Sequence, residues 1–380
     1  MADNNENKVL NVPHLRFPEF SGEWEMASLQ DIAAINPKSD QLQNTFIYID
    51  LEAVEKGELR KIQEIMREEA PSRAQRVINN NDILFQCVRP YQKNNYIHKI
   101  LNTSNQQWVA STGYAQIRTT ESPNYIYHLL NTDGFNRKVM VRCTGSSYPA
   151  INSEDLATIR FYYTPDKKEQ FKISRLLDLI DERIATQNKI IEDLKKLKSA
   201  ISERLFNAIK GDVVVLEDIG DVVKGKQING EFLSESGKYY VMNGGIEPSG
   251  FYNDYNVEAN TISISEGGNS CGYVQFNACP FWSGGHCYTI QNTTDNVKTE
   301  YLYQFLKSKE SEIMKLRIGS GLPNIQKKDL AKFKITIPNI SEQKVISAFL
   351  SSFERKADVE MNFVNLLLEE KQYLLRQMFI

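Results

Sequence analysis

The sequence has no long apolar run. No stretch approaches the ~20 consecutive apolar residues that a membrane-spanning helix requires. The first residues, Met-Ala-Asp-Asn-Asn-Glu-Asn, also lack the basic and apolar regions of a secretory signal. The 380 residues include five cysteines, a small and odd number that indicates reduced thiols rather than a disulfide framework. We therefore expect a cytoplasmic protein with no membrane partner.

An excess of charge of either sign is also missing. The chain has 45 Lys and Arg residues against 48 Asp and Glu residues, a net charge of −3. This balance argues against a free-standing protein that coats nucleic acid by bulk electrostatics, although it permits local basic surfaces. The length exceeds the roughly 100–200 residues of a typical domain and predicts two domains or more.

Several catalytic and cofactor motifs are absent as well. The sequence contains neither G-x-G-x-x-G nor G-x-x-x-x-G-K-[ST], the loops that cradle nucleotide phosphates, and no [DN]-P-P-[YF] of amino-group DNA methyltransferases. Cys271, Cys279, His286 and Cys287 have metal-ligand side chains, but their spacing does not match the paired cysteines of structural zinc. A Cys/His nucleophilic site has no identifiable third partner. We expect no catalytic residue, metal or cofactor in this chain, which we interpret as a binding module.

The chain contains an internal repeat. The pattern G-S-x-x-P-x-I-x-x-x-D-L occurs at residues 145–156 and again at 319–330, an offset of 174. Three further matches keep the same order, and they pair residues 29–32 with 216–219, 125–130 with 301–306, and 166–169 with 339–342. A shared order with small insertions predicts a duplicated unit of about half the chain.

Each copy ends in a long helix with apolar residues at alternating steps of three and four. This heptad pattern predicts a coiled coil, and two matched seams favour pairing of the helices over packing of each on its own domain. Asp166 and Glu169 match a capping box, and Gly211 is a plausible stop. The expected seam consists of Ile173, Leu177, Ile180, Ile184, Ile191, Leu194, Lys198, Ile201 and Leu205, and of Ile346, Leu350, Phe353, Glu360, Val364, Leu367, Lys371, Leu374 and Met378.

Polar residues interrupt both seams at equivalent places and predict the direction of the helices. Gln187 corresponds to Glu360, and Lys198 corresponds to Lys371. A parallel pair would bury two like charges ~4–6 Å apart, which is unfavourable. An antiparallel pair places Lys198 against Glu360 and Gln187 against Lys371, so that both contacts are attractive. We therefore expect antiparallel helices in this register.

Two regions combine basic, aromatic and amide side chains. Pro71–Arg118 contains six basic residues and one acidic residue, and Lys315–Lys334 contains six and one. Guanidinium, ammonium and amide groups bind phosphates and read base edges, whereas a solvated loop surface is the alternative interpretation. The candidate DNA-binding residues are Arg73, Arg76, Arg89, Lys93, Lys99 and Arg118 in the first copy, and Lys224, Lys226, Lys238, Tyr239, Asn243, Lys315 and Arg317 in the second.

The combination resembles a specificity subunit of a type I restriction-modification system, over essentially the whole chain. Besides the duplicated motif and the two helices, the resemblance rests on Pro13–Phe20 with Trp24, and on Asn81–Phe85 with Arg89-Pro-Tyr91. In the second copy, Asn243-Gly-Gly and Trp282-Ser-Gly-Gly-His-Cys287 look like one recurrent type of target recognition domain.

The resemblance implies an α+β fold, in which two mixed α/β target recognition domains form a pseudo-two-fold repeat joined by two long antiparallel coiled-coil helices. The domains would be residues 1–165 and 211–338, with spacer helices at 166–210 and 339–380. It also implies a non-catalytic subunit that reads a split double-stranded DNA target. Partners would be two methylation subunits, which bind S-adenosylmethionine, and restriction/translocase subunits, which bind ATP and Mg.

Two other interpretations remain open. One is a stand-alone or regulatory DNA-binding homologue without methylation partners, and the other is a coiled-coil interaction protein with no nucleic-acid role. A nuclease or methyltransferase acting alone is disfavoured by the missing motifs.

Overall fold

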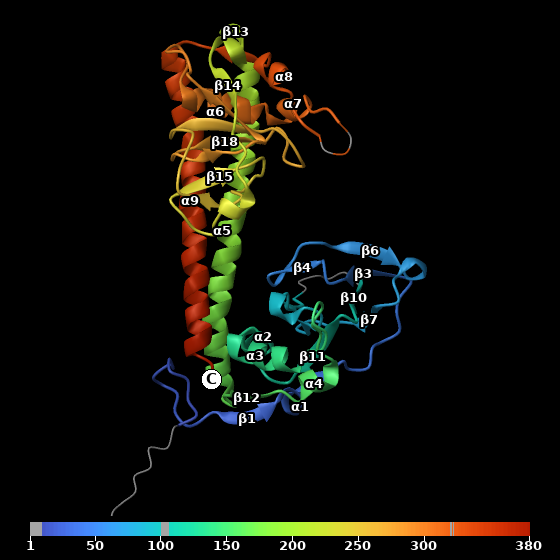
Figure 1. Cartoon of the computed structure of the whole chain (residues 1–380). Helices are drawn as coiled ribbons and strands as arrows, with labels where there is room; N and C mark the ends of the chain where they lie inside the picture. The colour runs from blue at the N-terminus through green and yellow to red at the C-terminus, as the bar shows by residue number, and fades with distance from the viewer. Residues whose placement is uncertain (1–9, 100–105, 320, 322) are drawn as a thin grey trace, which may run out of the picture. The chain divides into compact units, whose positions relative to one another are not determined.

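Two long helices, α5 (Lys167–Ala208) and α9 (Ile340–Gln377), are the main elements of the computed structural model (Figure 1). The structure describes residues 10–99, 106–319, 321 and 323–380; residues 1–7, discussed above as a possible signal, and Ser320 and Leu322 of the second repeat motif lie outside this set. The chain divides into two compact units, residues 1–186 with 363–380, and residues 187–362. Within the described residues, no helix is both long and apolar enough to cross a membrane.

In the first unit, a sheet of order β2-β11-β8-β9 packs against short helices, and a sheet of order β6-β3-β10-β7 contains the parallel pair β3/β10. The strand β8 is buried on both faces, which explains its continuous Ile-Leu-Phe run. The strands are β1 (Glu25–Ser28), β2 (Ala33–Ile35), β3 (Thr45–Ile49), β4 (Val54–Glu55), β5 (Glu58–Leu59), β6 (Gln63–Met66), β7 (Ala74–Val77), β8 (Ile83–Gln86), β9 (Tyr96–Ile97), β10 (Gln107–Ser111), β11 (Tyr114–Thr119) and β12 (Arg160–Tyr163). The helices are α1 (Leu29–Ile32), η1 (Arg67–Glu69), η2 (Pro90–Gln92), α2 (Pro123–Leu130), α3 (Asp133–Arg142) and α4 (Ser153–Ala157).

The second unit repeats this plan. Its sheet β14-β20-β17-β18 corresponds to the first sheet, β13 pairs with β21 as β1 pairs with β12, and β16-β15-β19 contains the parallel pair β15/β19. The strands are β13 (Asp212–Val215), β14 (Asp221–Lys224), β15 (Tyr239–Met242), β16 (Phe251–Tyr252), β17 (Thr261–Ser265), β18 (Val274–Asn277), β19 (Trp282–Ser283), β20 (Cys287–Gln291) and β21 (Lys334–Ile337). The helices are η3 (Leu216–Asp218), η4 (Gly230–Phe232), α6 (Thr299–Ser308), α7 (Glu310–Met314) and α8 (Lys327–Ala331).

Buried glutamines make the same hydrogen bonds in both units. Gln170, on α5, donates to the Thr164 carbonyl (2.8 Å) and accepts from the Ser122 N–H (3.0 Å). Gln343, at the equivalent position of α9, makes the corresponding bonds at 2.9 and 2.8 Å. The expected α+β fold, a duplicated unit joined by two long antiparallel helices, is therefore confirmed.

The heptad positions of both helices lie inside the helix pair. All the expected seam residues are buried or half-buried, and Leu177 and Leu350 are fully buried. Each completely buried leucine contributes about 1.5–3 kcal/mol relative to an exposed one. The seam lysines are half-buried, with side chains that are 16% exposed for Lys198 and 18% for Lys371.

Polar contacts show the register of the helices. Gln187 donates to Glu360, the Lys198 ammonium lies 2.8 Å from Glu354, and the Lys371 ammonium lies 2.5 Å from Asp181. The antiparallel direction is confirmed, but the expected contacts of Lys198 with Glu360 and of Gln187 with Lys371 are wrong. A long lysine side chain can reach a carboxylate beside the seam, so it need not face another seam residue.

The expected capping box at the start of α5 is half formed. The Asp166 carboxylate accepts from the N–H groups of Lys168 (2.7 Å) and Glu169 (3.3 Å). The Glu169 side chain does not reach back to Asp166 but binds Arg16 and Thr164. At the start of α9, Asn339 accepts from the Glu342 N–H (3.0 Å).

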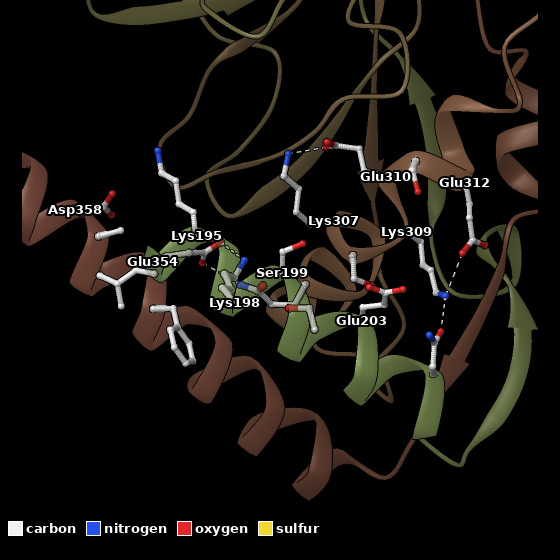
Figure 2. Close-up of a pocket in the computed structure, with 18 residues that line it drawn as sticks. Lys195, Lys198, Ser199, Glu203, Lys307, Lys309, Glu310, Glu312, Glu354 and Asp358 are labelled. Atoms are coloured by element: carbon white, nitrogen blue, oxygen red, sulfur yellow. Dashed lines mark hydrogen bonds and ion pairs between the residues drawn. The ribbon is translucent and has the colours of Figure 1, made fainter. Parts of the chain in front are cut away.

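A cavity of about 680 Å³ lies in the second unit, where α5, α6, α7 and α9 meet (Figure 2). Its charged side chains are largely paired with one another. The Lys198–Glu354 pair lines one part of it, and Lys307 pairs with Glu310 at 2.6 Å in another. Because lysines and carboxylates alternate around it, this cavity lacks the single sign of charge that a nucleic-acid groove needs.

The Glu354 carboxylate organises this junction, and its removal should destabilise the protein. It also accepts hydrogen bonds from the Tyr303 hydroxyl (3.1 Å) and the Gln304 amide (2.9 Å). We expect Glu354→Ala to lower the free energy of unfolding by about 1–3 kcal/mol, because three donors lose their acceptor. Asp358→Ala, one turn further along α9 at an exposed side chain, should change it by less than about 0.5 kcal/mol. Urea unfolding followed by circular dichroism measures both, and equal effects would contradict this role of Glu354.

Candidate nucleic-acid interface

The basic residues of the first unit differ in their surroundings. Arg73 is exposed just before β7, Arg76 is half-buried on β7, and Lys99 is exposed after β9. Burial lowers the pKa of Arg76, and its Nε has no hydrogen-bond partner among the described residues. Arg118 makes two hydrogen bonds of 2.8 Å to the buried carboxylate of Asp82. Arg118 therefore neutralises an internal acid, whereas Arg73 and Lys99 are exposed and Arg76 is only partly accessible.

Arg89 and Lys93 flank the short η2 helix and are held in an unusual backbone conformation. Both have φ of 53°, which is uncommon for residues other than glycine and is retained where the surroundings fix it. The Arg89 N–H donates to the Pro149 carbonyl (2.8 Å), and its guanidinium lies over the Tyr148 ring, 4.5 Å from the centroid. A guanidinium that lies over a ring can direct the N–H groups in its own plane toward a phosphate or a guanine edge.

Lys93 is less available than Arg89. Its ammonium donates to Asp133 (2.6 Å) and to the Asn131 carbonyl (3.2 Å). The hydrogen bond from Lys93 lowers the pKa of Asp133, so the carboxylate stays ionised and the pair stays formed. Binding of a phosphate by Lys93 requires it to exchange this partner.

In the second unit, the buried Glu266 carboxylate connects several candidate residues. Its Oε1 accepts from the Lys224 ammonium (2.6 Å) and from the Tyr288 hydroxyl (3.0 Å), and its Oε2 lies 3.6 Å from His286 Nδ1. Lys224 and His286 are themselves exposed. The negative charge of Glu266 is therefore compensated by the Lys224 ammonium and is not exposed at the surface.

A glycine-rich loop brings further candidates to the same place. The Trp282 indole donates to the Lys226 carbonyl (2.9 Å), and the Asn243 side chain accepts from the His286 N–H (3.2 Å). A Cβ at Gly284 would lie 2.5 Å from Asn243 Oδ1, so only glycine fits there. Lys224, Lys226 and Asn243 thus form one connected surface with Trp282 and His286, which we call the 224–286 surface.

The remaining candidates lie outside that network. The Lys238 ammonium is 5.0 Å from the centroid of the Tyr239 ring, which in turn packs 4.9 Å from the Tyr255 ring. Lys315 and Arg317 are exposed just after α7. No hydrogen bond between described residues joins either group to the 224–286 surface.

Cys271, Cys279 and Cys287 lie in separate environments. Cys271 and Cys287 belong to different buried apolar clusters, and Cys279 is exposed. Cys271 donates to the Glu266 carbonyl (3.0 Å). Among the residues that the structure describes, no group of three or more His, Cys, Asp or Glu side chains could hold a metal ion.

Two supporting residues could not be recognised as functional from their type alone. Tyr148, which lies below Arg89, is a variable position of the repeated G-S-x-x-P motif, and that repetition was the available signal. Glu266 could not be recognised because its partners Lys224 and Tyr288 are remote in sequence.

Comparison with known proteins agrees with this architecture. A family model described as the type I restriction modification DNA specificity domain matches residues 21–196 and again 210–367. The chain is 34% identical over 161 residues to a putative type I specificity subunit of Mycoplasma pneumoniae, covering 42% of each. It is 22% identical over 406 residues to the MjaVIII type I restriction enzyme specificity subunit of Methanocaldococcus jannaschii, covering 93% of this chain and 91% of the relative.

A solved structure shares the fold. The S subunit of a type I restriction-modification system from M. genitalium superposes with a TM-score of 0.65 at 18% identity, covering 97% of this chain and 99% of that one. The two family-model matches together span most of the sequence, one in each copy of the repeat. The chain therefore belongs to the family of type I restriction-modification specificity subunits and has two DNA specificity domains.

Proposed function

We propose that the chain reads a bipartite double-stranded DNA target, one half-site with each specificity domain, as a non-catalytic subunit of a larger complex. The observation that supports this most is a backbone arrangement that both units share and that carries a different residue in each. The backbone N–H that donates to the proline carbonyl of the repeated motif belongs to Arg89 in the first unit (2.8 Å) and to Gly268 in the second (3.0 Å). Two domains with the same backbone arrangement but different side chains could each bind a half-site of different sequence.

Partner subunits would supply further phosphate contacts and the cofactors of the complex. With 45 basic and 48 acidic residues, the chain needs additional phosphate contacts, which partner subunits that enclose the DNA can provide. We assign S-adenosylmethionine to the methylation subunit and ATP with Mg to the restriction/translocase subunit, and we place the complex in the cytoplasm with its DNA.

An exposed apolar stripe on the helices is our proposed docking surface for methylation subunits. In the second unit it includes Phe349 and Val359 of α9, which are 46% and 59% exposed, and Leu197 of α5, which is 50% exposed. Each of these residues precedes a seam residue by one position. In an antiparallel pair such positions lie on the same side of both helices, so these apolar side chains share one face, on which Ser352 and Lys356 also lie.

The first unit has an equivalent stripe, which includes Leu366, Tyr373 and Leu179 at 62%, 52% and 45% exposed. The acids that pair with the seam lysines, Glu354 and Asp181, each follow a seam residue by one position. They therefore lie on the opposite side of the helices from the stripe, and the domain body packs on that opposite side. Exposed apolar side chains gathered on one face of a protein often mark an interface. One stripe in each unit accounts for two copies of the methylation subunit, and restriction subunits would join that core.

A charged substitution in the stripe of one unit should prevent one methylation subunit from joining the complex. Phe349→Glu would require an unpaired carboxylate to be buried on docking, which is strongly unfavourable. We expect a complex with one copy instead of two by native mass spectrometry of the co-expressed subunits. Arg355→Glu, on the same helix but off the stripe, should leave two copies. Two copies with Phe349→Glu as well would contradict docking on this surface.

Removal of the stacked arginine should weaken DNA binding. If Arg89 contacts a phosphate, Arg89→Ala lowers affinity equally for target and unrelated duplexes and reduces the salt slope by about one; a base contact instead costs about 1–3 kcal/mol on the target alone. Fluorescence anisotropy across salt concentrations separates these cases. Lys189→Ala, an exposed lysine of α5, is the matched control, and unchanged affinity with Arg89→Ala would remove this residue from the interface.

A longer helix pair should change the spacing of the half-sites. An insertion within Leu194–Ile201 alone would disrupt the Lys198–Glu354 pair. Matched heptads inserted after Gln187 and after Glu360 lengthen each helix by about 10 Å and keep both ion pairs. We expect a longer preferred spacing with unchanged half-site sequences, measured by mapping methylated adenines in host DNA. Unchanged spacing in a folded variant would contradict a ruler role for the helices.

A further inference from the structure

In the first unit, an irregular segment before β1, with a turn at residues 18–19, packs against the start of α5 and holds a buried acid. The Arg16 guanidinium makes two parallel hydrogen bonds to the Glu169 carboxylate, at 2.7 and 2.9 Å. It also donates to the carbonyls of Gly22 (2.6 Å) and Ser21 (3.2 Å). Glu169 is fully buried, so this carboxylate depends on the arginine for its compensation. The hydrogen bond with Glu169 raises the pKa of Arg16.

The residues beside Arg16 strengthen the same contact. The Lys172 ammonium lies over the Phe17 ring, 4.4 Å from its centroid. The Leu15 N–H donates to the Gln377 carbonyl (2.9 Å) and so satisfies an acceptor at the end of α9. The segment therefore binds the start of one helix and the end of the other through an arginine, an aromatic ring and its own backbone.

The second unit has an equivalent acid, Glu342, but no counterpart of the Arg16 segment that covers Glu169. An offset of 173 residues relates Glu169 to Glu342 and Lys172 to Val345. The chain enters this unit directly from α5, which ends at Ala208, and β13 begins four residues later at Asp212. No counterpart of the Arg16 segment fits into so short a connection. Glu342 is exposed, and among the described residues nothing pairs with its carboxylate.

An open apolar groove lies beside Glu342. It has a volume of about 460 Å³, between the end of α5 and the start of α9. Leu205 and Ile209 form one wall, and Val345 and Ile346 form the other. Val345 is 69% exposed, so the position that carries a lysine in the first unit presents an aliphatic surface here. We call Glu342 and these four residues the Glu342 groove.

We propose that the Glu342 groove binds a segment of a partner protein that contains an arginine followed by an aromatic or aliphatic residue. The first unit shows the chemistry, since Arg16 and Phe17 occupy the equivalent place there. A planar guanidinium matches a carboxylate with two parallel hydrogen bonds, which an ammonium cannot make. The ring or aliphatic side chain that follows would cover Val345.

The occupant is a separate protein rather than a second copy of this chain. The Arg16 segment of any copy is already engaged with its own Glu169, at the high effective concentration of an intramolecular contact. Release of that segment would leave a buried carboxylate uncompensated, which is strongly unfavourable. A partner segment that starts unbound has no such cost.

The natural Arg16 segment serves as a probe. A fluorescent peptide of residues 10–24 is titrated against the full chain, and binding is followed by anisotropy. We expect saturable binding at one site, weakened roughly tenfold or more by Glu342→Gln, and weakened similarly when the peptide carries Arg16→Lys. Val345→Asp should also weaken binding, because it places a charge in the apolar wall. Glu235→Gln, at an exposed acid elsewhere in the unit, is the matched control.

Three results would overturn the proposal. Absence of saturable binding, or equal binding by Glu342→Gln and the control, would overturn the proposal. A dimer of the chain that Glu342→Gln dissociates would identify the occupant as a second copy and would overturn it too. Thermal unfolding of each variant reports whether the fold is retained. Duplex binding measured on the same samples tests the proposed function separately, because the Glu342 groove lies outside the basic surfaces.

Discussion

The half-buried lysines of the helix seam determine the register in which the two antiparallel helices pair. Lys198 pairs with Glu354 and Lys371 pairs with Asp181, and an offset of 173 residues relates both members of one pair to those of the other. The same contact is therefore made twice. Gln187 and Glu360, which are also equivalent, contact each other, as equivalent positions do only at the midpoint of an antiparallel pair. An apolar seam alone would tolerate a shift by one heptad, whereas these polar contacts would lose their partners.

The same register attaches each domain body to the helices. In the second unit Tyr303 and Gln304 of α6 donate to Glu354, so the acid that fixes the register also binds the body. In the first unit His128 of α2 contacts Asp178 at 2.9 Å, at the position equivalent to Ser351, which Gln304 contacts in the second unit. Burial lowers the pKa of His128, so the neutral imidazole is the favoured form in this contact. A slip of the helices would break these attachments, so in each unit the domain body depends on the register of the helices.

The fold could be predicted from the sequence more fully than the site, for physical reasons. Periodicity and repetition are local or regular signals, and they predicted the duplicated unit and the pairing of two long helices, whereas the antiparallel direction was predicted from the charges that interrupt the seams. The register prediction failed because lysine side chains reach carboxylates outside the heptad positions. Arg118 could not be recognised as the partner of Asp82, since the strand pairing of β8 with β11 brings together residues that the sequence separates. The same holds for Glu266 and Lys224, so residue type alone overestimated the number of free basic groups.

A duplicated chain with antiparallel helices cannot enter both of its units in the same way. The first unit follows an irregular segment, whereas the second follows the end of α5 directly. The segment that compensates Glu169 consequently has no room in the second copy, although the acid persists there as Glu342. A carboxylate that is buried and paired in one unit is thus exposed in the other. This difference follows from how the chain connects to each unit, and it gives two units of the same plan different exposed surfaces.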